Sequence, residues 1–198
     1  MISLVLSVLS LALSILTAWL TLLRRGKLRM TRPTVIYFGP DGGPRKDATL
    51  KVFLRTLLYS TAKRGRVIES MYVRLRRAES TQNFNIWTYG EKGELRRGSG
   101  LFVPETGVEA NHHFLLPSDG THFKFLPGEY HLEVFVSSVN AAPKILLSVK
   151  LALSKEEAKA IETDDRGVYF DWGPDSLSYQ PHISSRPISA IDLLWQTE

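Results

Sequence analysis

The sequence of 198 residues contains no cysteine, which excludes disulfide bonds and thiolate metal sites. It also contains no Asn-x-Ser/Thr motif for N-glycosylation. Both absences are typical of a domain that stays in the cytosol, because small secreted domains are often rich in disulfides. A chain of this length can still bury a hydrophobic core without such cross-links.

Motifs for catalysis or cofactor binding are also lacking. Residues 98–100 read Gly-Ser-Gly, but they lack the strand-to-helix turn that a nucleophile elbow requires. Residues 42–46 are rich in glycine and basic side chains, but no predicted helix follows them that could bind a phosphate. The sequence therefore predicts no cofactor and favours a protein that is not an enzyme.

The first 23 residues contain no charged side chain, proline or glycine. As a helix, residues 2–23 would span about 33 Å at about 1.5 Å per residue, which matches a bilayer core of about 30 Å. Trp19 lies near the end of this segment, where an interfacial aromatic residue is expected. The alternative is a cleaved signal peptide, which usually has a basic start, a shorter apolar run and a small-residue cleavage site. Because these features are missing, residues 1–23 are predicted to be a transmembrane helix.

The next segment, residues 24–33, is predicted to be a basic juxtamembrane linker. Its basic side chains are Arg24, Arg25, Lys27, Arg29 and Arg32, whereas only Met1 precedes the helix. By the positive-inside rule, the N-terminus is outside and the C-terminal domain is cytoplasmic. The same five side chains can bind anionic lipid head groups, at roughly 1 kcal/mol each.

The hydroxyl residues of the helix follow a regular pattern. They alternate at spacings of four and three, as in a heptad seam, at positions Ser3, Ser7, Ser10, Ser14, Thr17 and Thr21. In lipid, small side chains let helices approach closely, and hydroxyls can bond between helices. The pattern predicts a helix-packing seam and a possible homo-oligomer. The alternative is that each hydroxyl bonds a carbonyl of its own helix.

The remaining chain is strongly polarised in charge. Residues 24–100 carry 18 basic and 6 acidic side chains, a net charge of +12, whereas residues 101–198 carry 7 basic and 14 acidic side chains, a net charge of −7. A candidate basic patch comprises Lys63, Arg64, Arg66, Arg74, Arg76, Arg77, Arg96 and Arg97. Such a patch suits anionic lipid, nucleic acid or an acidic protein. With a membrane helix present, lipid is the expected partner rather than nucleic acid. The alternative is an ordinary solvated sheet face.

Residues 34–172 are predicted to form an antiparallel, immunoglobulin-like β-sandwich. Alternating or β-branched runs separated by turn residues predict strands at 34–38, 50–60, 67–76, 83–89, 100–103, 108–116, 130–136 and 145–151. The basic turn at 63–66 predicts a hairpin between the second and third of these strands, with Val67, Met71, Val73 and Leu75 on one face. The segment at 126–136 resembles a late strand of many immunoglobulin-like domains.

The C-terminal part is predicted to begin with a short helix. Ser154 and Glu157 have the spacing of a capping box, which opens a helix to about residue 161, and residues 168–172 suit a final strand. Residues 173–198, rich in proline and serine, are expected to be a loose tail. Within this tail, one helical stripe is formed by Ile188, Ile191, Leu194 and Trp195. A helix there would dock on its own domain or bind a partner.

Histidines concentrate between residues 112 and 131. His112, His122 and His131 are the candidate metal ligands, but the spacing matches no established metal motif. His113 directly follows His112, so the two side chains should face opposite sides of a strand. Ordinary loop and edge histidines are the favoured interpretation.

Together these features favour a non-enzymatic, single-pass membrane protein whose cytoplasmic sandwich binds an unidentified protein partner. A ligand-binding sensory module, for a nucleotide or a glycan, is a second hypothesis. A metal-dependent hydrolase that uses the histidines is a third. Sandwich folds host all three kinds of function, so fold class does not decide between them.

Overall fold

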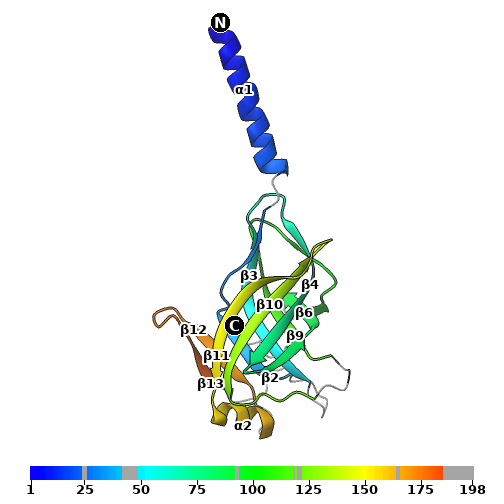
Figure 1. The fold of residues 1–198 in the computed structure, drawn as a ribbon, viewed down its shortest axis with the longest axis vertical. Coiled ribbons are helices and arrows are strands. Elements are labelled where there is room, and N and C mark those ends of the chain that lie inside the picture. Colours follow the sequence, from blue (N-terminus) through cyan, green and yellow to red (C-terminus); the bar gives the residue numbers. More distant parts are fainter. Residues whose placement is uncertain are drawn as a thin grey trace.

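The computed structural model describes residues 1–23, 26–41, 49–91, 94–117, 119, 122–163 and 166–184. One long helix, α1 (Ile2–Ala18), projects from one end of a β-rich domain, and the short helix α2 (Lys155–Thr163) lies at the opposite end (Figure 1). A π-helical turn at Trp19–Leu23 extends α1 toward the domain. The chain therefore consists of an N-terminal apolar helix and a mostly antiparallel β-sheet domain with a short helix.

Helix α1 is rich in leucine, which is a good helix former, and it includes no proline or glycine. None of the described side chains of α1 is buried. The segment Ile2–Thr21 is long and apolar enough to cross a membrane, although a signal sequence shares this length and composition.

The domain contains two antiparallel sheets. The first has eight strands in the order β13-β12-β2-β3-β9-β6-β7, with β1 paired to β3. Its strands are β1 (Leu28–Met30), β2 (Val35–Pro40), β3 (Leu50–Ser60), β6 (Ile86–Glu91), β7 (Glu94–Arg97), β9 (Val108–Leu115), β12 (Val168–Gly173) and β13 (Ser178–Ile183). The second sheet has the order β11-β10-β4-β5, with β8 paired to β4. Its strands are β4 (Arg66–Arg77), β5 (Ser80–Phe84), β8 (Leu101–Val103), β10 (Gly128–Ser138) and β11 (Lys144–Leu153).

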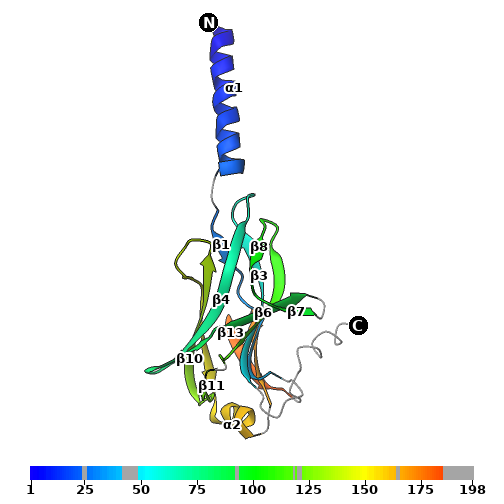
Figure 2. The same cartoon turned by 90° about the vertical axis from the view of Figure 1, so that its right-hand side faces the viewer.

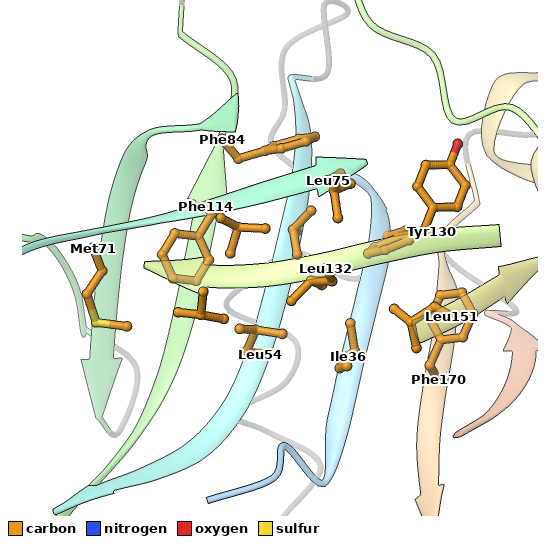
Figure 3. Packing of buried hydrophobic residues seen from close by; sticks show 14 of the residues in the cluster. Ile36, Leu54, Met71, Leu75, Phe84, Phe114, Tyr130, Leu132, Leu151 and Phe170 are labelled. Carbon is orange, nitrogen blue, oxygen red and sulfur yellow. The ribbon is translucent and has the colours of Figure 1, made fainter. Parts of the chain in front are cut away.

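The hydrophobic core lies between the two sheets, which face each other (Figure 2). Figure 3 shows that both sheets contribute side chains, including Ile36, Leu54, Phe114 and Phe170 from the first and Met71, Leu75, Leu132 and Leu151 from the second. Aromatic rings fill one part of this core, where Phe38 stacks on Phe125 with ring centroids 4.9 Å apart. Each fully buried side chain of this size contributes roughly 1.5–3 kcal/mol to folding.

The predicted β3–β4 hairpin is wrong, although the strand positions are confirmed. Strand β3 pairs with β1, β2 and β9 in the first sheet, whereas β4 pairs with β5, β8 and β10 in the second. Residues 61–65 therefore cross from one sheet to the other. Although β3 and β4 are consecutive in sequence, each carries side chains that belong to the core. The two strands therefore face each other across the sandwich and do not pair side by side.

The predicted inward face of β4 is also corrected at its start. The pairing of β4 with β10 shifts register where Ser137 and Ser138 oppose Ser70 and Ile68. Glu69 is the extra residue of this bulge, so the alternation changes there. Ile68 is consequently buried and Val67 is 46% exposed.

Three further segments differ from the predictions. The strand predicted at 83–89 is divided between β5 and β6, which belong to different sheets. Within the predicted linker, Leu28–Met30 forms β1 and pairs with the end of β3. The predicted final strand at 168–172 is confirmed as β12, but the predicted loose tail after it contains β13, because Tyr179 and Ile183 pack against the core despite the surrounding proline and serine residues.

The capping box of α2 is confirmed. The backbone N–H of Ser154 donates to Oε2 of Glu157 at 2.6 Å, and the backbone N–H of Glu157 donates to Oγ of Ser154 at 3.2 Å. Ala158 and Ile161 of α2 are then buried against the core. The C-terminal stripe at 188–195 lies outside the described residues.

Candidate functional site

The hydroxyl side chains of α1 lie on the surface of an exposed helix. Ser7 and Ser14 donate to the carbonyls of Ser3 and Ser10, each at 2.9 Å. Thr17 and Thr21 donate to the carbonyls of Leu13 and Thr17, each at 2.8 Å. Four of the six hydroxyls thus bond carbonyls of their own helix, as the alternative to a packing seam expects. A hydroxyl oxygen that donates one bond can still accept another, so the packing seam stays a prediction.

The basic residues of the predicted juxtamembrane linker lie in different surroundings. Arg24 and Arg25 lie outside the described residues. Lys27 and Arg29 are exposed, and the chain here bonds to the domain, with the N–H of Lys27 donating to Oγ1 of Thr61 at 2.8 Å. Arg32 lies farther away, and its guanidinium carbon sits 4.0 Å from the ring centroid of Trp172.

The eight residues of the predicted basic patch occupy three separate places. Lys63, Arg64 and Arg66 lie in the β3–β4 crossing and at the start of β4, near α1. Arg74, Arg76 and Arg77 lie at the other end of β4, eight or more positions along the strand, or about 27 Å at about 3.4 Å per residue. Arg96 and Arg97 belong to β7, in the other sheet. The structure therefore does not bring these side chains into one patch.

The group at the distal end of β4 makes structural contacts. Nη2 of Arg76 lies 2.8 Å from Oε1 of the largely buried Glu133. Nε of Arg74 donates to Oδ1 of Asn83 at 3.2 Å, and its guanidinium covers the ring of Phe135 at 4.6 Å. These contacts stabilise the solvent-facing side of the second sheet. They fit the alternative in which the basic residues belong to an ordinary solvated sheet face.

The two adjacent histidines face opposite sides of β9, as predicted. His112 faces the core, where its Nδ1 accepts a hydrogen bond of 3.2 Å from Nε1 of Trp87. His113 faces the other side and packs against Phe53 with ring centroids 4.9 Å apart. Burial lowers the pKa of His112 to about 4. Burial, together with the nearby charge of Lys51 and the neighbouring His112, lowers the pKa of His113 to about 3. Both imidazoles are therefore neutral near pH 7.

A small cluster on the outer face of the first sheet surrounds His113. Tyr37, Phe53 and Tyr169 are buried there. The ammonium of Lys51, whose side chain is 2% exposed, lies 2.9 Å from Oδ1 of Asp41. A buried ammonium needs such a partner because desolvation of an unpaired charge is costly. Sequence reasoning missed this cluster, and the mixture of Lys51 with the aromatic residues of β2 and β3 was the available signal.

The three candidate metal ligands belong to separate elements. His112 is in β9, His131 is in β10 opposite Arg76 and Lys150, and His122 is in the segment that precedes β10. Among the residues that the structure describes, no group of three histidine, aspartate or glutamate side chains is close enough to bind a metal ion. The metal interpretation thus gains no geometric support.

A pocket of about 470 Å³ opens where the edges of the two sheets meet. It is lined by Arg32, Glu129, Ser148, Val149, Lys150, Leu151, Ala152, Trp172, Leu177, Ser178 and Tyr179. Tyr179 is fixed by a 2.9 Å hydrogen bond from its hydroxyl to the carbonyl of Pro33, and burial raises its pKa against the opposing effect of Arg32. Aromatic faces, cations and one carboxylate therefore surround a cavity of ligand size. Sequence reasoning missed this pocket because its walls come from segments more than 100 residues apart.

No protein-family model, curated protein or solved structure matches this chain.

Proposed function

We propose that this protein is a non-enzymatic, single-pass membrane protein whose β-domain is a cytoplasmic interaction or scaffold module. The observation that carries the proposal is the contrast between α1 and the domain. The apolar side chains of α1 are exposed, whereas those of the domain fill its core. An exposed apolar helix of this length is stable only when another apolar phase surrounds it, and a bilayer provides one.

The proposed topology places the N-terminus outside and the domain in the cytoplasm. Its support is the set of five basic residues at 24–32, directly after the helix. A reporter that is active only in the cytoplasm, fused after Glu198, should be active. Activity of a periplasmic or lumenal reporter at the same position would contradict this topology. An N-terminal epitope tag that remains on the mature chain would distinguish a membrane helix from a cleaved signal peptide.

Lateral assembly is proposed through the hydroxyl seam of α1. Replacing Ser7, Ser10 and Ser14 together by leucine should weaken association, because the larger side chains hold the helix backbones apart. Replacing Leu6, Leu9 and Leu13 together by isoleucine is the matched control and should change little. Förster transfer between labelled full-length chains in vesicles measures the association. Equal effects of the two triple variants would show that the hydroxyls serve only their own helix.

The β-domain is proposed to be immunoglobulin-like and to bind a protein partner. Its support is a sandwich of two antiparallel sheets and the absence of a catalytic motif in the sequence. Crosslinking in intact cells, followed by capture of the full-length chain, tests this function. Recovery of the same partner with a variant that carries an unrelated apolar helix would assign the binding to the domain. Capture of no specific protein would contradict the scaffold proposal.

A second candidate function is ligand binding in the pocket beside Trp172. The favouring observation is the combination of two aromatic side chains with Arg32 and Lys150, which suits an anionic or planar ligand such as a nucleotide. A thermal-shift panel of nucleotides and glycans on the full-length protein is the test. A stabilising ligand should lose its effect in the Lys150→Ala variant, whereas Lys155→Ala is the control outside the pocket.

A further inference from the structure

The end of the β-domain next to α1 brings together chain connections from both sheets. Leu28 pairs with Ser60, Arg66 with Val103, and Ile68 with Ser138. The β3–β4 crossing, β8 and the β10–β11 turn therefore lie at one end, which we call the helix-proximal end. Figure 2 shows β1, β4 and β8 near α1, whereas α2 lies at the far end of the domain.

Three large apolar side chains are exposed at the helix-proximal end. Val67, Phe102 and Val139 are 46%, 55% and 57% exposed. Val67 and Phe102 are register partners in β4 and β8, so their side chains share one face. The bulge at Glu69 turns Val67 outward, and the Phe102 ring lies so close to Gly65 that an added Cβ would meet it at 2.5 Å. The fold thus holds these apolar groups in solvent rather than in the core.

Basic side chains surround this apolar group. Lys27, Arg29, Lys63 and Arg64 are exposed and Arg66 is partly exposed. The exposed acidic residues near this end include Glu69, Glu105 and Glu109, and Glu109 is paired with Arg55 at 3.5 Å. The opposite end is mixed in charge, because α2 carries Glu156, Glu157 and Glu162 along with two lysines, and Arg76 and Arg77 lie at the distal end of β4. An apolar patch within a basic rim is the composition expected of a surface that meets anionic lipid.

The chain keeps this end close to α1. Only three Cα–Cα steps separate Leu23 from Gly26, a reach of at most about 11 Å. Gly26 is buried against Ala62, and the N–H of Thr61 donates to the carbonyl of Lys27 at 3.0 Å. If α1 spans a bilayer, the helix-proximal end must therefore lie at the depth of the lipid head groups or directly beneath them.

We propose that the helix-proximal end is a lipid-binding surface that rests on an anionic leaflet. Phe102, Val67 and Val139 enter the interfacial layer, and Lys63 and Arg64 contact lipid phosphates. This inference rests on the proposed membrane insertion of α1, and it adds a second contact that fixes how the domain sits on the membrane. The partner is the bilayer itself, and no second protein is required.

The natural absence of cysteine allows a direct test with the full-length chain in vesicles. Single variants Phe102→Cys and Val139→Cys are spin-labelled, and accessibility to oxygen and to a water-soluble nickel chelate is measured. Leu126→Cys is the matched control, because Leu126 is 43% exposed but precedes β10 at the distal end. Strand β10 has 11 residues, so this control lies roughly 37 Å from the lipid-binding surface at about 3.4 Å per residue. Leu9→Cys reports insertion of α1.

In vesicles with anionic lipid, labels at positions 102 and 139 should gain oxygen accessibility and lose nickel accessibility relative to position 126. Exchanging Lys63 and Arg64 for glutamine should lower the equilibrium constant for contact between the domain and the leaflet by about fivefold for each side chain. In vesicles of zwitterionic lipid alone, the labels at positions 102 and 139 should likewise stay more accessible to nickel, even when Lys63 and Arg64 are kept.

Two results would overturn the inference. Labels at 102, 139 and 126 that are equally accessible to nickel, while the label at Leu9 is in lipid, would show that the domain stands free of the membrane. Loss of both oxygen and nickel accessibility at 102 and 139 would show that another protein chain, and not lipid, covers this end. A label at position 9 that remains in water would instead refute the proposed function, and with it this inference.

Discussion

Helix α1 and the β-domain use the same apolar side chains in opposite ways. Leu9 in α1 is 61% exposed, whereas Leu132 in β10 is fully buried between the sheets. The domain provides its own apolar surroundings through tertiary contacts, and α1 has none among the described residues. Hydrophobic content alone therefore does not locate a core, because length and period decide which apolar segments can bury each other.

The two helices repeat this difference on a smaller scale. Helix α2 has nine residues and begins with a reciprocal capping box, since a short helix in water needs partners for its first N–H groups. Helix α1 begins at Ile2, and its N-cap residue Met1 makes no side-chain capping bond. In a bilayer, its stability would come from the satisfied backbone inside an apolar phase.

The largest effect should come from removing β13. Full-length protein truncated after Gly173 loses the six paired positions of β13 and the packing of Tyr179 and Ile183, and it exposes the edge of β12. We expect the domain to become protease-sensitive while α1 remains in the membrane. Protein truncated after Ser184 is the control and should resist proteolysis. Equal digestion of the two chains would mean that the hairpin is dispensable.

A leucine-to-alanine substitution should affect domain stability in the core but not in α1. Leu132→Ala should lower the free energy of unfolding of the domain by about 2–5 kcal/mol, because it leaves a cavity between the sheets. Leu9→Ala removes the same atoms from α1 and should leave domain unfolding unchanged. Denaturant unfolding followed by tryptophan fluorescence, to which the buried Trp87 contributes, measures both variants. A comparable loss in Leu9→Ala would show that α1 packs on the domain.

Acid should destabilise the domain through its buried histidines. The pKa of His112 is lowered to about 4 by burial, whereas an unfolded histidine titrates near 6.5. Its contribution to stability is thus fully present above about pH 7 and is lost as the pH falls from 6.5 toward 4. At pH 5 the free energy of unfolding should be lower by about 2 kcal/mol because of this residue. His112→Gln keeps a hydrogen-bond acceptor for Trp87 and should flatten the pH profile. Parallel profiles for both proteins would refute this assignment.

The smallest effect concerns the start of α2. Ser154→Ala removes one half of the capping box and should lower domain stability by about 1 kcal/mol. Ser3→Ala in α1 is the matched change at a helix start without such a box, and it should have no effect on domain unfolding. Thermal unfolding monitored by circular dichroism compares the two. An unchanged midpoint in Ser154→Ala would show that the cap contributes little.

Local patterns in the sequence predicted local structure well. The strand at 50–60 has the predicted bounds, the capping box of α2 forms, and His112 and His113 face opposite ways. Each of these depends on residues only a few positions apart. Alternation of side chains or the spacing of a cap is sufficient to specify them.

Features that depend on distant partners were missed. The β3–β4 crossing and the outward position of Val67 are determined by which strand lies alongside, and β13 is held by the packing of Tyr179 and Ile183 on the core. The predicted basic patch was divided for the same reason, since Arg66 and Arg77 mark opposite ends of one strand. The pocket beside Trp172 needs segments from both sheets, so no local pattern could have indicated it.

The pairing of β1 with β3 has a mechanical consequence. A pull on α1 away from the domain reaches the sheet at Lys27 and then acts along the axis of β1. The bonds between Lys27 and Thr61 and the 2.9 Å bond from Thr31 to the carbonyl of Leu57 lie at the two ends of β1. A load along the strand is therefore shared between these bonds and the ladder instead of opening them one at a time. The short connection behaves as a shear-loaded clamp, which would transmit tension from α1 directly into the first sheet.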